Sequence, residues 1–342
     1  MQRRYYIDYL RVFSCAAIVA LHVIANRLDN IAPTEPYYLS LSALMIFDRF
    51  AVPCFFMISG CNLLGRDQEF HLVKKHCIRM LIFVCIWGFL YEIADAVIYL
   101  IVNGTLDSSL LSFSNLFVGN ASHLWFCFAI IGLYLFIPLI NPLVKDKKRC
   151  EYFLGICLLS SIILPFLKTS PHVPSIFTMI SHLLEFPNTG VYVFYFVLGY
   201  YLENHLELDR KSRLFIYTAS ILSFLTMIFY VFFNAIKYQL HTGISTPEHL
   251  TAIIFSMGVF VFFKYNFSQG KLYPLFRTLS KYSLGIYAMH NYLIVRLGLK
   301  GIHALMWSPF IAVPVVTFLV FFLCLSAGWV LKKIPLIGKW IV

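Results

Sequence analysis

The sequence of 342 residues is 60% apolar and only 13% charged, and its mean hydropathy is +0.78. Soluble domains carry about twice that share of charged residues, so the composition excludes an ordinary soluble protein. The net charge of +11 does not indicate nucleic-acid binding, because the basic residues form short clusters between apolar runs and no continuous stripe or tail.

The apolar residues form separate runs of about 20, the length at which a helix crosses a hydrocarbon core of roughly 30 Å. Outer-membrane barrels show short alternating segments instead. We therefore predict an all-α, polytopic integral membrane protein with about ten transmembrane helices. The predicted spans are residues 7–25, 41–64, 78–102, 123–144, 152–167, 190–203, 214–234, 250–263, 283–299 and 309–331.

The first run carries Asp8 and Arg11 and no small-residue cleavage site follows it, so we expect a retained helix and not a signal peptide. Lysine and arginine should be in excess in the cytoplasmic loops. With the N-terminus inside, the inner segments hold 20 of the 27 Lys and Arg residues and the outer loops hold five. This asymmetry predicts cytoplasmic termini. The sequence shows no soluble domain and no linker, so we expect a single membrane-embedded domain over residues 1–342.

The two remaining cations, Arg11 and Arg49, fall inside predicted helices, where a charge is costly and usually faces a cavity or a partner. Arg11 and His22 are eleven residues apart, which is three helical turns and about 16 Å, so both project from one face. That face can line a pore from a cytoplasmic mouth at Arg11 to a reaction centre at His22, whose imidazole can accept a proton. The structural alternative is an interfacial arginine and a histidine bonded within the bundle.

In the second predicted span, Arg49 follows Asp48 and precedes the segment VPCFFMISG, residues 52–60. The proline frees backbone groups, and Ser59-Gly60 permits a bend or a close helix contact. Packing explains the serine and glycine as well as function does, and an ion pair with Asp48 would be a structural explanation of Arg49.

The third predicted span begins with the basic segment Lys74-Lys75-His76-Cys77-Ile78-Arg79. Topology signalling explains most of this cluster, but its cations also suit the phosphates of a cytosolic donor. Glu92 and Asp95 lie deeper in the span and are candidate proton-handling groups or partners of the arginines.

The fourth span opens with His123 and Trp125, where an aromatic residue at the membrane interface is the ordinary expectation. The ninth span places His290 in an otherwise apolar stretch, and two such histidines suggest function more strongly than one. The nine cysteines include no CxxC pair, so we expect packing residues and no disulfide, zinc or other metal site.

Four blocks, taken in order, resemble those of the acyltransferase-3 family of integral membrane acyltransferases. They are Asp8-Tyr9-Leu10-Arg11 with His22, residues 52–60 against VPxFFxxSG, residues 123–126 against LWF, and residues 283–290 against SLxIYxxH. With the number of spans, these blocks cover the chain from end to end. The lack of an appended domain resembles in particular the branch of the enterobacterial common antigen O-acetyltransferase.

The resemblance implies an enzyme of the bacterial cytoplasmic (inner) membrane that transfers an acyl group, usually acetyl from acetyl-CoA, to a hydroxyl of a cell-surface or lipid-linked glycan. Acetyl-CoA would be a co-substrate, and no metal is implied. The family's first-helix arginine and histidine correspond to Arg11 and His22, and its second-helix arginine to Arg49. Its RxxR pattern in the third helix appears here as His76-x-x-Arg79.

Our hypothesis is that His22 acts as general base, or carries the acyl group, to activate a sugar hydroxyl. The residues expected to bind the donor are Arg11, Lys75, His76 and Arg79. Lys74 is a further candidate for the positive charge that the first arginine of the RxxR pattern carries in the family and that His76 replaces here. The residues expected to orient the acceptor or stabilise charge are Arg49, His123, Trp125 and His290.

The expected partners are membrane lipid and a glycan or lipid-linked saccharide, without nucleic acid, and the sequence does not indicate an oligomeric state. The alternative function is a permease for a small solute or glycan intermediate, since ten helices with buried charges also suit a transporter, and a related membrane domain is attached to serine racemases. A structural scaffold explains neither Arg11 nor His22.

Overall fold

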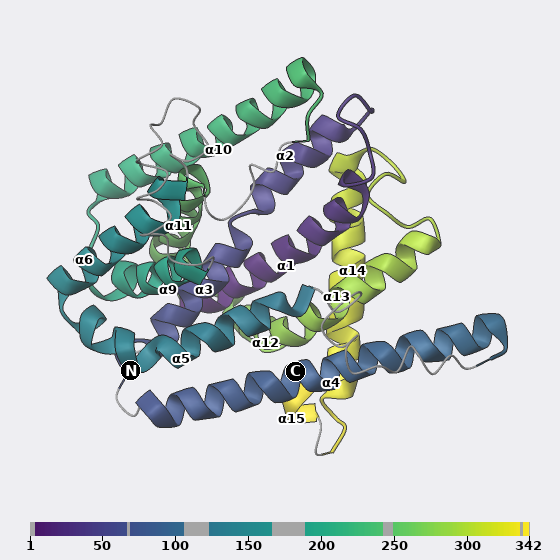
Figure 1. Ribbon diagram of the computed structural model, residues 1–342, viewed down its shortest axis with the longest axis horizontal. Coiled ribbons are helices and arrows are strands. Elements are labelled where there is room, and N and C mark those ends of the chain that lie inside the picture. The colour runs from purple at the N-terminus through teal and green to yellow at the C-terminus, as the bar shows by residue number, and fades with distance from the viewer. Residues whose placement is uncertain are drawn as a thin grey trace.

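The computed structural model describes residues 4–66, 69–105, 123–165, 189–241, 249–335 and 338–341. Within these ranges the chain forms helices joined by short connections and contains no strand, so the all-α prediction is confirmed (Figure 1). The first helices are α1 (Tyr5–Leu28), α2 (Tyr38–Asp48), α3 (Ala51–Leu63), α4 (Glu69–Asn103), α5 (Trp125–Lys145) and α6 (Lys147–Leu158), which continues into a π-helical turn at Leu159–Ile163. The later helices are α9 (Thr189–Asn204), α10 (Arg210–Tyr238), α11 (Leu250–Asn266), α12 (Tyr273–Ser280), α13 (Ser283–Leu299), α14 (Pro309–Leu331) and α15 (Gly338–Ile341).

Helices occupy the described part of every predicted span, but the described residues contain six segments that are both long and apolar enough to cross a membrane. These segments are Tyr5–Leu28, Tyr38–Leu63, Phe70–Asn103, Trp125–Lys145, Arg210–Tyr238 and Pro309–Leu331. The helices α9, α11 and α13 have 16 or 17 residues. Their length of about 25 Å falls short of a hydrocarbon core of about 30 Å. The number of ten membrane-crossing helices therefore stays a prediction, and so does the cytoplasmic location of both termini.

The second predicted span is divided into α2 and α3 by a break at Arg49 and Phe50. Pro53 accounts for this break, because its ring would clash with the carbonyl of the residue four positions earlier, which is Arg49. Since α3 begins at Ala51, Pro53 lies in the first turn, where a backbone N–H has no intrahelical partner in any case. The break leaves Arg49 at the C-terminal end of α2.

The helix α1 runs through the middle of the bundle and packs against α2, α3, α11, α12, α13 and α14 (Figure 1). Its side chains Leu10, Val19 and Ile24 have no exposed surface. The helices α10 and α14, in contrast, expose many large apolar side chains, Phe229 and Phe318 among them. Exposed apolar surface of this extent marks a contact face, and in a membrane protein that face meets lipid.

The helices α1 and α13 lie side by side and run in the same direction. Four contacts join α1 to α13 and to the end of α12 just before it. They are Arg11 Nη1 to Ser280 Oγ (3.2 Å), Cys15 Sγ to Ser283 O (3.6 Å), the rings of His22 and His290 (4.9 Å between centroids) and Arg27 Nη2 to Gly298 O (3.3 Å). The partners are separated by 268 to 271 residues in every case, so the two helices are parallel and stay in register over about four turns.

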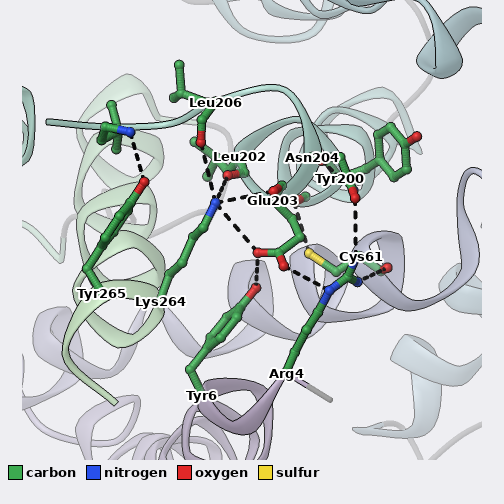
Figure 2. Close-up of polar contacts among 12 residues, drawn as sticks. Arg4, Tyr6, Cys61, Tyr200, Leu202, Glu203, Asn204, Leu206, Lys264 and Tyr265 are labelled. Atoms are coloured by element: carbon green, nitrogen blue, oxygen red, sulfur yellow. Dashed lines mark hydrogen bonds and ion pairs between the residues drawn. The ribbon is translucent and has the colours of Figure 1, made fainter. Parts of the chain in front are cut away.

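A polar cluster joins the beginning of α1 to the ends of α3, α9 and α11 (Figure 2). The carboxylate of Glu203 forms ion pairs with Arg4 at 2.8 Å and Lys264 at 3.6 Å, and it accepts a hydrogen bond from the Tyr6 hydroxyl at 2.6 Å. Arg4 also donates to the carbonyl of Cys61 at 2.6 Å. The Lys and Arg distribution predicts that Arg4 and Lys264 lie on the same side of the membrane, and their shared carboxylate agrees with that prediction.

The closest helix contact that glycine makes possible is between α3 and α9. A Cβ atom on Gly60 would lie 1.7 Å from the carbonyl oxygen of Phe196, and one on Gly199 would lie 2.2 Å from the carbonyl oxygen of Met57. Both obstacles are backbone atoms, which cannot rotate away. Of the two roles the sequence leaves open for the Ser59-Gly60 pair, a bend or a close contact, the structure shows the close contact at Gly60.

We predict that Gly60→Ala destabilises the protein by about 3 kcal/mol or more, because the added methyl group forces α3 and α9 apart. Gly132→Ala in α5 is the matched control, since no described atom lies within 4 Å of its added Cβ. Thermal unfolding in detergent measures the melting temperatures of both variants. Equal melting temperatures for the two variants would contradict the close contact.

Candidate active site

A cavity of about 480 Å³ lies between α1, α3, α4, α5 and α13. Its basic lining residues are Arg11, His76, Arg79, Lys281 and Lys332. Among the described residues no carboxylate lines it. Guanidinium and ammonium groups bind phosphate oxygens through charge-assisted hydrogen bonds, and clustered cations raise the local concentration of anions. The lining of the cavity therefore suits an anion, and phosphate groups are one kind of anion that it can bind.

Arg11 is held on the cavity wall by a chain of hydrogen bonds. Its Nη1 donates to Ser280 Oγ at 3.2 Å, and the Ser280 hydroxyl donates to Asp8 Oδ1 at 2.8 Å. The other carboxylate oxygen of Asp8 accepts from the Tyr273 hydroxyl at 2.8 Å. Asp8 and Arg11 are three residues apart and so share a face of α1. The Asp8-Tyr9-Leu10-Arg11 block thus fixes the direction of the guanidinium against α12.

Three histidine rings meet further along α1. They belong to three separate parts of the fold: His22 to α1, His123 to the turn before α5, and His290 to α13. The ring centroids of His22 and His290 are 4.9 Å apart, those of His123 and His290 are 5.3 Å apart, and those of His22 and His123 are 6.4 Å apart. His290 is completely buried and His123 is 4% exposed, whereas His22 is half-buried.

Backbone carbonyls on α13 hold two of these rings. The Nδ1 of His290 lies 2.6 Å from the carbonyl oxygen of Tyr287, and the Nε2 of His123 lies 3.2 Å from that of Ala288. A carbonyl oxygen only accepts, so each of these ring nitrogens carries the proton. The hydroxyl of Tyr91 donates to the Ala288 carbonyl at 2.5 Å, and the hydroxyl of Tyr287 donates to the backbone carbonyl of His123.

The three rings do not form a metal centre. In the part of the chain that the structure describes, no group of three or more His, Cys, Asp or Glu side chains is arranged to hold a metal ion. With two ring nitrogens engaged by carbonyls, the cluster is suited to proton transfer by His22.

The cavity leads toward the histidines. Ile18 and Tyr287 both line it, and each lies one helical turn before a histidine, His22 on α1 and His290 on α13. Arg11 therefore lies on the cavity wall, and His22 lies about 16 Å from it along the same helix. None of the three histidines is among the described lining residues, so a ligand in the cavity would have to extend past Ile18 to reach the imidazole.

The structure brings most of the predicted site residues into this region. His76 and Arg79 line the cavity, whereas Lys75 is exposed and is not among the described lining residues. Arg49 interacts electrostatically with Asp29, Asp48 and His22. Its Nε is buried without a hydrogen-bond partner among the described residues.

Two other candidates lie away from the cavity. Trp125 is 42% exposed and packs against Tyr192, with ring centroids 5.5 Å apart, which fits an interfacial residue. Asp95 forms an ion pair with Arg296 of α13 at 2.5 Å.

Lys281 and Lys332 line the cavity, but the sequence interpretation assigned them only to topology. A local signal existed for Lys281, which stands two residues before the SLGIYAMH segment. Lys332 follows α14 and has no such motif beside it, so only the folded structure shows its position.

A family of proteins described as "Acyltransferase domain" matches residues 4–329 of the chain. The chain is also 30% identical over 160 residues to a protein named amino-acid racemase from Enterococcus faecalis. That match covers 44% of this chain and 22% of the racemase, so the chain spans less than a quarter of this curated relative's length. No solved structure matches the chain.

We predict that Lys332→Ala weakens binding of pyrophosphate, used as a simple probe, by about three- to tenfold, because it removes one cation from the cavity. Lys333→Ala is the matched control, since Lys333 lies over the ring of Trp329, 3.3 Å from its centroid, and does not line the cavity. Titration calorimetry at low salt measures both affinities. An equal loss in the two variants would show that the probe responds to net charge and not to the cavity.

Proposed function

The chain belongs to the acyltransferase-3 family, and we propose that it transfers an acetyl group from acetyl-CoA to a hydroxyl of a cell-surface or lipid-linked glycan. The family and the six apolar helices make it a multi-pass membrane acyltransferase. The observation that carries the finer proposal is the cation-lined cavity, whose lining residue Ile18 lies one helical turn before His22 on α1. We place the enzyme in the bacterial inner membrane, as one membrane-embedded domain.

The donor fits the cavity by charge and by shape. Coenzyme A carries its phosphates at one end and its thioester at the end of a long, thin arm. The phosphates would contact Arg11, Arg79 and the lysines of the cavity, and the arm would extend along α1 past Ile18 toward His22. This placement keeps the charged end of the donor away from the apolar interior, where an unpaired charge is costly.

His22 is the group we assign to the chemical step. Its imidazole takes the proton of the acceptor hydroxyl while that oxygen attacks the thioester carbonyl. The carbon–sulfur bond then breaks, the acetyl group stays on the acceptor oxygen, and the departing thiolate takes the proton from the imidazolium. The positive charge of Arg49, which acts on His22 from the end of α2, favours the negative charge that develops on the carbonyl oxygen.

We do not infer racemase activity for this chain from the name of that relative, because the shared stretch covers only 22% of the racemase. The branch of the enterobacterial common antigen O-acetyltransferase is our proposal for the acceptor class, on the strength of the sequence blocks alone. Mass spectrometry of surface glycans from a deletion strain tests it, since the missing mass identifies the acyl group and its carrier together. Unchanged glycan masses would contradict the proposed acceptor class.

We predict that His22→Ala reduces acetyl transfer by at least about 100-fold, because general-base catalysis contributes about 10² to 10⁴ to the rate. The assay combines purified protein, radiolabelled acetyl-CoA and a glycan acceptor extracted from the deletion strain. His71→Ala is the control, since His71 is exposed on α4 and is not among the described residues that line the cavity.

A folded His22→Ala variant that keeps most of its activity would show that the general base is another group. Solute flux without any label on the acceptor would contradict the enzyme and support the permease. Size-exclusion elution and melting temperature establish that the variant is folded.

A further inference from the structure

His290 combines complete burial with an unpaired ring nitrogen. Its Nδ1 donates to the carbonyl of Tyr287, three residues earlier in the same helix, at 2.6 Å. With the proton on Nδ1, the neutral ring presents a lone pair at Nε2. That Nε2 is buried and has no hydrogen-bond partner among the described residues. Buried polar atoms are nearly always paired, so an unpaired one calls for a functional explanation.

The ring nearest to His290 among the described histidines is that of His22, at 4.9 Å between centroids. Two imidazoles joined by an N–H···N hydrogen bond have centroids about 5 Å apart, which is a bond of about 2.9 Å plus two ring radii. The structure shows no hydrogen bond at that nitrogen, but the χ2 torsion of histidine is broad, and a small rotation of His22 would close it.

The other groups that act on His22 are less well placed to accept its N–H. His123 carries its proton on Nε2, toward the Ala288 carbonyl, and its ring lies farther from His22, at 6.4 Å between centroids. Arg49 has only donors. Tyr91 donates its hydroxyl hydrogen to that same carbonyl. Among the described residues, His290 from α13, His123 from the turn before α5 and Arg49 from the end of α2 are the titratable and charged groups that act on His22.

Exposure assigns the two histidines different roles. His22 is half-buried and can meet a substrate, whereas His290 has no exposed surface and can act only through a neighbour. A histidine that serves as general base needs one ring nitrogen protonated and held by an acceptor, so that the other is free to take a proton.

We propose that His290 is a positioning residue whose Nε2 accepts the N–H of His22 and leaves the opposite nitrogen of His22 free to take the hydroxyl proton. This inference rests on the proposed function, in which His22 is the general base. Because His290 is neutral, it holds the imidazolium of His22 less strongly than a carboxylate would. The imidazolium therefore returns its proton readily to the departing thiolate.

The test compares His290→Gln with His290→Asn. The glutamine amide reaches the position of Nε2 and can accept from His22, whereas the asparagine amide reaches the position of Nδ1 and can only keep the bond to Tyr287. We expect His290→Asn to lower kcat by about 100-fold with little change in KM for acetyl-CoA, and His290→Gln to recover at least about a tenth of the wild-type kcat.

The pH profile is a second readout that a purely structural role would not move. An acceptor for the N–H favours the protonated form of His22, so its loss should shift the acidic limb of the kcat profile to lower pH in His290→Asn. His290→Gln should keep the wild-type profile. The His290→Gln and His290→Asn side chains differ little in size. The melting temperatures of the two variants show whether both have lost packing relative to the wild type.

Two outcomes overturn the inference while the proposed function stands. One is equal activity of His290→Gln and His290→Asn, whether high or low, and the other is an unshifted pH profile in His290→Asn. In both cases His22→Ala would still be inactive. An active, folded His22→Ala variant would instead contradict the proposed function itself, so the two failures are distinguishable.

Discussion

The parallel contact between α1 and α13 determines where the chemistry of this protein lies. Because the two helices run in the same direction with a constant offset, Arg11 meets Ser280 at one end and His22 meets His290 three turns further along. A slip of one helical turn would move every pair apart by about 5.4 Å. The hydrogen bonds of Asp8 to Ser280 and Tyr273 prevent that slip, since they connect the beginning of α1 to α12, just before α13 starts.

This alignment separates the cations that line the cavity from the histidines. The cations of the cavity gather near Arg11, where α12 and the end of α14 close the bundle, and the three imidazoles lie deeper, among apolar helices. A neutral imidazole costs far less free energy in a bilayer than a guanidinium does, so the arrangement suits a membrane interior. In the function we propose, the phosphates of the donor stay at the charged end while its thioester extends toward the histidines.

The helices followed from the sequence, because apolar runs depend on residues close in the chain. The break at Arg49 was not predicted, although Pro53 explains it, and the sequence left both a bend and a close contact open at Ser59-Gly60. The number of membrane-crossing helices could not be predicted from the sequence, because α9, α11 and α13 are so short that their hydropathy does not decide whether they cross the membrane. The histidine cluster did not follow either, since His123 and His290 are 167 residues apart and no local pattern joins them. The position of Lys332 in the cavity lining was not predicted, because a lysine that follows a membrane helix is usually a topology signal.

The claim on which the function depends is that one wall of α1 connects a phosphate site at Arg11 to a reaction centre at His22. A cryo-EM map of the protein with a non-hydrolysable acetyl-CoA analogue tests it most directly. The phosphates should contact Arg11 and Arg79, and the acetyl end should lie against the ring of His22. Phosphates bound at the opposite end of α1, near Arg27, or side chains of Arg11 and His22 turned into lipid, would contradict the claim.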